Sequence, residues 1–237
     1  MKKQVLALLL LWVGVPVSAQ TVLQQFTAVS SGAGTVSDMD LPQPTAKGSV
    51  LIATPVQLSP DIRLISVTDN APEGSNIYKQ VVGATSSCGK KSLEIWYCED
   101  CRPGVTELKF HLSGHVKGSL NGFLEVSGLA LSSVLDGNGV HLADGVATSA
   151  GSEAGPTIKT TAPDFIIARY FSDPPMPTAV TPEAWKFNSS FVYVLNGESG
   201  KYQPTLSGGK AKSEYCMGMA AFKSAAPVPV APPASKE

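Results

Sequence analysis

Acidic side chains on neighbouring predicted strands are the first candidates for a catalytic role. Glycosidases need two carboxyl groups at a defined separation in a cleft. The residues that fit this requirement by position are Glu94, Glu99, Asp100, Glu107 and Glu125. Such carboxylates more often form the solvated face of a sheet, so we assign no catalytic residue from the sequence.

Aromatic residues form the second group that could carry function. Their faces offer apolar area with a polar handle, which suits stacking on sugars or contact with a protein surface. The candidates for a binding platform are Trp96, Trp185, Tyr170, Tyr193 and Tyr202. Aromatic residues make up only 7% of the chain, so a hydrophobic core competes for the same side chains.

Cysteines are the third group, and they occur at Cys88, Cys98, Cys101 and Cys216. An even number in an exported chain indicates disulfides, and four cysteines allow three pairings. The segment from Cys98 to Cys101 also has the spacing of a redox motif or of half a zinc site. Acidic residues between the two thiols disfavour the redox chemistry, and zinc needs two more ligands at fitting spacing. We therefore predict structural disulfides, with no metal and no cofactor.

Many short strands must position these groups, because glycine and proline interrupt the chain at short intervals. Residues 30–47 and 69–76 have loop or turn composition. The pattern predicts an all-β fold, a two-sheet antiparallel β-sandwich of jelly-roll type. The predicted strands are 22–29, 49–56, 63–68, 77–84, 92–98, 105–112, 123–126, 165–170, 190–195 and 215–222.

The strand at 105–112 shows the clearest alternation of polar and apolar residues. Successive side chains of a strand face opposite sides, so one face should be buried and the other wet. We expect Leu108, Phe110 and Leu112 to point inward, and Glu107, Lys109 and His111 to point outward.

Residues 1–19 have the parts of a secretory signal peptide. Lys2 and Lys3 are followed by an apolar run, and Val17-Ser18-Ala19 offers compact residues before a cleavage point. The run is too short to cross a bilayer, which takes roughly 20 residues, and no later segment is long enough. We expect a secreted or periplasmic protein.

Composition divides the rest of the chain into one domain and a tail. Residues 20–224 are expected to form the β-sandwich, and the proline- and alanine-rich residues 225–237 a disordered tail. Charged residues make up 16% of the chain and the net charge is −1, so no nucleic-acid partner is indicated.

The order of several short motifs is also informative. They are Gly48-Ser49-Val50-Leu51-Ile52-Ala53, Val67-Thr68-Asp69-Asn70, Ile95-Trp96-Tyr97, Leu124-Glu125-Val126-Ser127-Gly128 and Thr161-Ala162-Pro163-Asp164-Phe165. In this order they resemble a group of uncharacterised secreted bacterial β-sandwich domains over residues 48–223. The resemblance implies a jelly-roll-like sandwich and no particular activity. The chain departs from that group by a longer loop at 70–76 and by Cys98 and Cys101.

These observations favour a secreted, non-catalytic binding or surface-interaction module for glycans or an envelope protein. The alternative is an extracellular polysaccharide hydrolase. A carboxylate pair in a cleft would favour the enzyme, whereas a flat exposed aromatic strip would favour the binding module. The oligomeric state is not readable from the sequence.

Cleavage after Ala19 is the prediction that follows from the first 19 residues. Mass spectrometry of the exported protein should find Gln20 at the N-terminus, because signal peptidases cut after compact residues that follow the apolar run. An exported form that still carries Met1 would contradict it.

Overall fold

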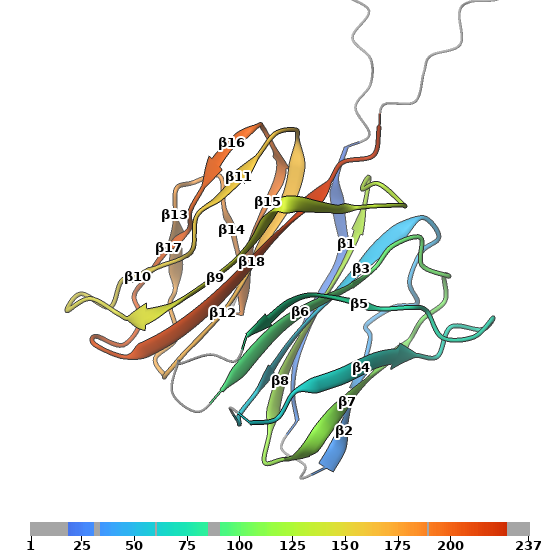
Figure 1. The fold of residues 1–237 in the computed structure, drawn as a ribbon, viewed down its shortest axis with the longest axis horizontal. Helices are drawn as coiled ribbons and strands as arrows, with labels where there is room; N and C mark the ends of the chain where they lie inside the picture. The colour runs from blue at the N-terminus through green and yellow to red at the C-terminus, as the bar shows by residue number, and fades with distance from the viewer. Residues whose placement is uncertain (1–18, 31–33, 60, 85–90, 189, 227–237) are drawn as a thin grey trace, which may run out of the picture.

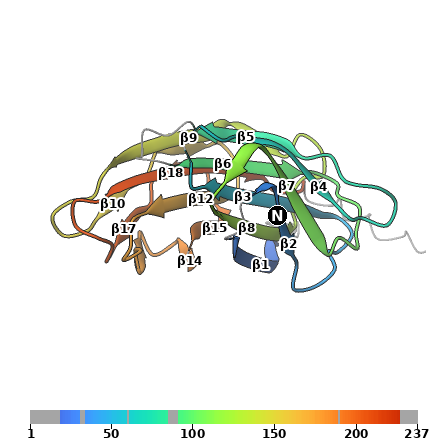
Figure 2. The ribbon, with the colours of Figure 1, turned by 90° about the horizontal axis from the view of Figure 1, so that it is seen from below.

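The computed structural model describes residues 19–30, 34–59, 61–84, 91–188 and 190–226, and this part of the chain contains strands and turns but no helix. Cys88, residues 1–18 of the predicted signal peptide and residues 227–237 of the predicted tail lie outside it. Two five-stranded antiparallel sheets pack face to face at the centre, and smaller sheets cover their outer faces (Figure 1, Figure 2).

The N-terminal half forms the first central sheet and the first outer sheet. In spatial order, the first central sheet contains β1 (Thr21–Ser30), β8 (Ser119–Ser127), β3 (Ser49–Gln57), β6 (Ser92–Cys98) and β5 (Lys79–Ala84). The first outer sheet contains β2 (Gly34–Asp40), β7 (Glu107–Val116) and β4 (Leu64–Asp69). One buried apolar cluster, which includes Leu51, Phe110 and Phe123, lies between these two layers.

The C-terminal half repeats this layering with smaller outer sheets. The second central sheet contains β14 (Lys186–Asn188), β15 (Phe191–Gly197), β12 (Asp164–Ser172), β18 (Glu214–Lys223) and β9 (Leu135–Val146). Its outer face carries the sheet of β10 (Glu153–Ala154), β17 (Thr205–Ser207) and β13 (Ala179–Thr181), and the pair β11 (Ile158–Thr160) and β16 (Gly200–Tyr202). Ile158 and Leu206 pack there in one cluster with Ile166 and Met219.

A third cluster fills the interface between the two central sheets. The Tyr97 ring meets the Phe222 ring edge-on, with centroids 5.6 Å apart, and Phe165 lies 6.3 Å from the same ring. Because both faces of each central sheet are covered, β3 and β6 are buried at every residue. Strands covered on both faces read as continuous apolar runs rather than alternating ones, which explains the sequence of residues 49–56.

The predicted all-β antiparallel sandwich is confirmed, and each predicted strand overlaps a strand of the structure. Three smaller sheets add to the two expected, and the jelly-roll connectivity stays a prediction. The loop predicted at 30–47 is wrong over β2, where Ser37 and Met39 are buried and the strand pairs with β7. β9 was also missed, because Asp136-Gly137-Asn138-Gly139 has turn composition, although Leu135 before it and residues 140–146 after it pair with β18.

β7 has the predicted orientation. Phe110 is fully buried, and its strand neighbours Leu108 and Leu112 are buried on the same face. Lys109, on the opposite face, is half-buried and forms an ion pair with Glu107 at 3.3 Å.

Truncation of Phe110 should therefore cost far more stability than truncation of Lys109. We expect Phe110→Ala to lower the free energy of unfolding by about 3–5 kcal/mol, because a fully buried ring leaves a cavity. Lys109→Ala should change it by no more than about 0.5 kcal/mol, as for most surface substitutions. Chemical denaturation measures both values, and equal losses would contradict a strand buried on one face.

Candidate functional site

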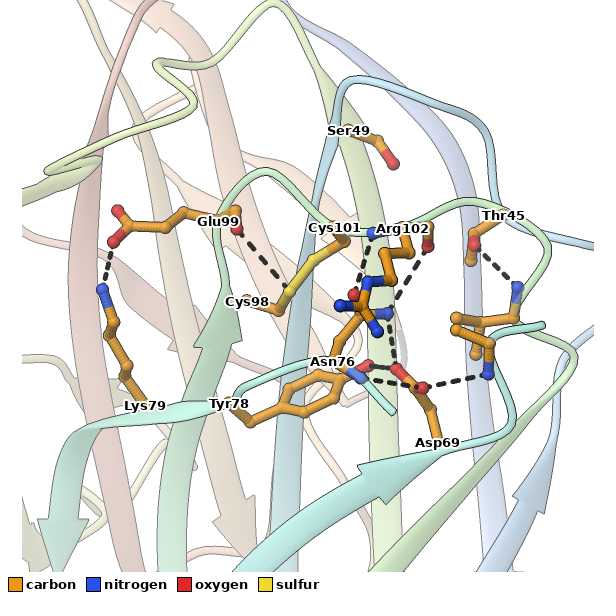
Figure 3. Close-up of a disulfide and its surroundings, with 12 residues drawn as sticks. Thr45, Ser49, Asp69, Asn76, Tyr78, Lys79, Cys98, Glu99, Cys101 and Arg102 are labelled. Carbon is orange, nitrogen blue, oxygen red and sulfur yellow. Dashed lines mark hydrogen bonds and ion pairs between the residues drawn. A yellow bond between two sulfur atoms is a disulfide. The ribbon is translucent and has the colours of Figure 1, made fainter. Parts of the chain in front are cut away.

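Asp69 organises the loop that joins β4 to β5, residues 70–78. Its carboxylate accepts hydrogen bonds from the backbone N–H groups of Ala71 and Asn76, both at 3.1 Å. The Asn76 side-chain amide and the Tyr78 hydroxyl donate to it at 2.7 and 2.8 Å (Figure 3). Burial, together with the charge and hydrogen bond of Asp69, raises the pKa of Tyr78 well above its ordinary value. The phenol therefore stays a donor, and the loop is fixed by one carboxylate.

Two asparagines fasten this loop to the loop between β6 and β7, residues 99–106. The Asn76 side-chain oxygen accepts the backbone N–H of Arg102 at 2.8 Å. The Asn70 side-chain oxygen accepts the backbone N–H groups of Thr106 and Glu107 at 2.9 and 3.0 Å. The two asparagine side chains thus accept hydrogen bonds from backbone N–H groups that are not hydrogen-bonded to a neighbouring strand.

A disulfide and an arginine complete the connection between the loops. Cys98, the last residue of β6, bonds to Cys101, and both residues are buried. The Arg102 guanidinium donates to the backbone carbonyls of Glu73 and Gly74 at 2.6 and 2.9 Å. Both loops are therefore held in one conformation before any ligand arrives.

An ion pair between Lys79 and Glu99 borders the second loop (Figure 3). Glu99 also accepts the backbone N–H of Val134 at 3.0 Å. Burial alone would raise the pKa of Glu99, but the hydrogen bonds from Lys79 and Val134 and the lysine charge hold this pKa below its ordinary value. Glu99 is ionised at neutral pH, so it has no proton to donate in acid catalysis.

A pocket of about 350 Å³ opens where the two loops meet the segment between β8 and β9. Ile77, 79% exposed, and Leu131, 40% exposed, supply its apolar lining together with Cys98. The polar lining consists of Ser75, Asn76, Lys79, Glu99, Asp100 and Arg102. A pocket of this volume suits a small molecule or a few side chains.

The pocket combines apolar contact with charges of both signs. Its lining holds two carboxyl groups, and one of them, Glu99, is already paired with Lys79. The lining residues therefore lack the two available carboxylates that glycoside hydrolysis needs. Across the described ranges, no group of three or more His, Cys, Asp or Glu side chains could hold a metal ion.

The five aromatic residues predicted as a binding platform lie in three different core clusters. Trp96 belongs to the cluster between the first central and first outer sheets, and Tyr193 packs against the cluster between the central sheets. Trp185 and Tyr170 are buried on the far side of the second central sheet, where Tyr202 is half-buried. The structure does not bring these rings together on one surface.

The disulfide prediction is confirmed for Cys98 and Cys101. Cys216 is disulfide-bonded as well and packs in a small buried cluster with Val56 and Leu93. Cys88 lies outside the described residues.

Two of the predicted acidic candidates are buried and serve the fold. Glu94 accepts hydrogen bonds from Leu64 N–H, Gln80 Nε2 and Trp96 Nε1 at 2.9, 2.9 and 2.7 Å. Burial, opposed by these hydrogen bonds, raises the pKa of Glu94. Glu125 likewise accepts hydrogen bonds from Gln24, Ala46 and Ser49. Neither carboxylate lines the pocket.

Asp136 and Asp164 form a buried carboxyl pair that the sequence analysis missed. They lie near the starts of β9 and β12, with 7% and 0% of their surface exposed. Burial, followed by the hydrogen bond and the charge of Asp136, raises the pKa of Asp164 to about 7, against the opposing charge of Lys223. Because Asp164 is fully enclosed, we interpret the pair as part of the fold rather than as a catalytic dyad.

Comparison with known proteins adds no relative, since no family model, curated protein or solved structure matches the chain. The resemblance to secreted bacterial β-sandwich domains stays a prediction. Among the described residues, no helix is long and apolar enough to cross a membrane.

Sequence reasoning did not identify the pocket. It named three of the lining residues for other roles, Cys98 as a disulfide candidate and Glu99 and Asp100 as acidic candidates. Ile77, Lys79 and Leu131 were not identified, because nothing in the sequence shows that these separate segments converge.

Replacement of Asp164 should remove part of the pH dependence of stability. Folded Asp164 keeps its proton up to about pH 7, whereas the unfolded carboxyl loses it near its ordinary pKa of 3.8. Folding takes up a proton between these values, so the contribution of Asp164 to stability falls as the pH rises from about 4 to about 7. Asp164→Asn cannot titrate.

Urea denaturation of wild type and Asp164→Asn at about pH 5 and about pH 7.5 measures this contribution. The stability of the wild type relative to the variant should decrease toward the higher pH. A difference that stays constant across this range would contradict a raised Asp164 pKa.

Proposed function

We propose that this protein is a non-catalytic binding module of the extracytoplasmic space, and that the pocket beside the Cys98–Cys101 disulfide binds a segment of a partner protein. The observation that carries this proposal is Ile77, 79% exposed on a loop that hydrogen bonds already fix. A preorganised loop loses little conformational freedom on binding, so apolar contact with Ile77 converts more fully into affinity.

A protein partner fits the lining better than a glycan does. Sugar sites use aromatic faces for stacking, and the residues of this pocket include no aromatic ring. The aliphatic side chains of Ile77 and Leu131 next to Lys79, Asp100 and Arg102 suit a peptide with an apolar residue beside a charged one. An envelope protein is therefore the partner class that we favour.

The alternative, a polysaccharide hydrolase, has less support from the arrangement of carboxyl groups. The charge of Glu99 is paired with that of Lys79, and Glu94 and Glu125 hold neighbouring segments by hydrogen bonds. The buried carboxyl groups of Asp136 and Asp164, 7% and 0% exposed, are enclosed in the fold. A binding role needs none of these groups to react.

Selection of peptides from a random phage-displayed library on the mature domain tests this proposal. We expect enriched peptides with an aliphatic residue beside a charged one, and Ile77→Asp should weaken their binding at least about tenfold, or about 1.4 kcal/mol. Burial of an isoleucine side chain is worth about 1.5–3 kcal/mol.

Ile65→Asp is the matched control, because Ile65 on β4 is also exposed, at 63%, and does not line the pocket. It should leave peptide binding unchanged. A glycan array and a polysaccharide hydrolysis assay run in parallel. Binding of glycans in place of peptides, turnover of a polysaccharide, or equal losses in the two variants would refute the proposal.

A further inference from the structure

β1 is an edge strand whose outer side is open among the described residues. It lies at one end of the first central sheet and pairs only with β8. An edge strand presents a row of backbone N–H and C=O groups that can pair with a strand of another chain. At ten residues, β1 is long for an edge.

β1 lacks the side chains that usually protect an edge. Proteins place charged residues or proline on such strands, and residues 21–30 contain neither. The other edge strand of the same sheet, β5, begins with Lys79. β1 instead exposes large apolar side chains, with Leu23 at 45%, Phe26 at 39% and Val29 at 76%.

We propose that β1 pairs antiparallel with β1 of a second copy of this chain, about a two-fold axis at Phe26. The pairing joins the first central sheet of one copy to the first central sheet of the other, which gives one continuous sheet of ten strands. Figure 2 shows β1 on one lateral side of the stack, opposite β5 and β9, so a second copy would approach from that side.

The bulge in β1 fixes which side chains share a face. Val22 lies opposite Val126 and Gln24 lies opposite Glu125, so Leu23 is an extra residue in the pairing with β8. Val22 therefore lies on the same face as Gln25, Thr27 and Val29, although an odd number of positions separates it from each of them.

Antiparallel pairing about a two-fold axis requires facing residues to lie on the same face of the sheet. The axis must therefore pass through a residue, and it is placed at Phe26. Allowing for the bulge at Leu23, the facing pairs are Phe26 with Phe26, Gln25 with Thr27, Gln24 with Ala28, Val22 with Val29, and Thr21 with Ser30.

This register matches the strand to itself in polarity and in length. Apolar side chains meet at the axis and at the Val22–Val29 pairs, and hydroxyl groups meet at both ends. An axis at Gln25 would leave Val29 beyond the paired region, and an axis at Thr27 would leave Val22 beyond it. Because β1 carries no charge, self-pairing brings no like charges together within the strand.

Gln20, the residue before β1, does not extend this edge. Gln20 is buried, its side-chain amide donates to Ser224 at 2.6 Å, and its side-chain oxygen accepts the Asn196 N–H at 2.6 Å. These bonds turn the chain toward the second central sheet, so the strand available for pairing begins at Thr21.

Sedimentation of the mature protein between about 1 and 100 µM tests the association. We expect a monomer–dimer equilibrium, and Phe26→Lys should raise its midpoint concentration at least tenfold, because two lysines would meet at the axis. Val29→Lys should act in the same direction at a side chain that is already 76% exposed, so folding should tolerate it. Ile65→Lys, on β4, is the control and should associate as the wild type does.

A monomer throughout this range would overturn the proposal. A dimer unchanged by both β1 substitutions would overturn it as well, because another surface would then form the contact. Circular dichroism confirms that each variant is folded.

Cross-linking tests the register separately. None of the cysteines that the structure describes is free, so Phe26→Cys introduces a thiol that diamide can oxidise. Two thiols from two copies give one disulfide, and diamide takes up the two electrons and two protons. Facing residues of antiparallel strands have Cα atoms about 4.5–5.5 Å apart, within the span of a disulfide. We expect a covalent dimer on a non-reducing gel.

Val29→Cys is the matched control, because the two Val29 residues of the proposed dimer lie about 20 Å apart along the strands. It should stay monomeric on the same gel. Cross-linking of Val29→Cys as fast as Phe26→Cys, or none of Phe26→Cys, would overturn the register.

Discussion

The face-to-face contact between the two central sheets holds the outer parts of the molecule in place. Its side chains come from both halves of the sequence, and they include Ile52, Ile95 and Leu124 on one side and Phe165, Ile167 and Phe222 on the other. Each such side chain contributes roughly 1.5–3 kcal/mol when it is fully buried. Exposing either inner face would lose this contribution, so we interpret the two halves as one folding unit. The outer sheets and the loops are then built on a rigid support.

A buried cation, Arg169, helps to fix how the two central sheets are placed relative to each other. Arg169 of β12 donates to the carbonyl of Ser190 and, across the interface, to the carbonyl of Leu120 in β8. Burial lowers the pKa of Arg169 to about 9, so the side chain stays charged at neutral pH. A buried charge is costly unless polar groups replace its water, so these two hydrogen bonds favour the relative placement of the sheets that brings both carbonyls to the guanidinium. Leu120 is the register partner of Val29, and this constraint therefore reaches the neighbour of β1.

The sequence predicted the features that depend on neighbouring residues and missed those that depend on distant ones. Alternation in β7 and the apolar run of β3 follow from local pattern, and both were found. β2 and β9 have loop and turn composition, and only pairing with β7 and β18 makes them strands. The aromatic residues stayed candidates for both a binding platform and the core, because sequence alone does not show that three clusters would take them up. The pocket was missed because its lining comes from segments that meet only after the sheets have formed.

The pocket and the open edge lie at opposite sides of the first central sheet. Lys79 is the first residue of β5, and Cys98 ends the adjacent strand β6, whereas β1 is the far edge strand. Pairing through β1 would therefore leave both pockets of a dimer open. Two pockets on one rigid body can bind two ligands of one surface, and the second binding event then becomes intramolecular. Such a surface would be bound more tightly than a single pocket allows. An apolar edge and a small pocket would each be a weak feature alone, and under the two proposals they would act together on a surface that carries repeated ligands.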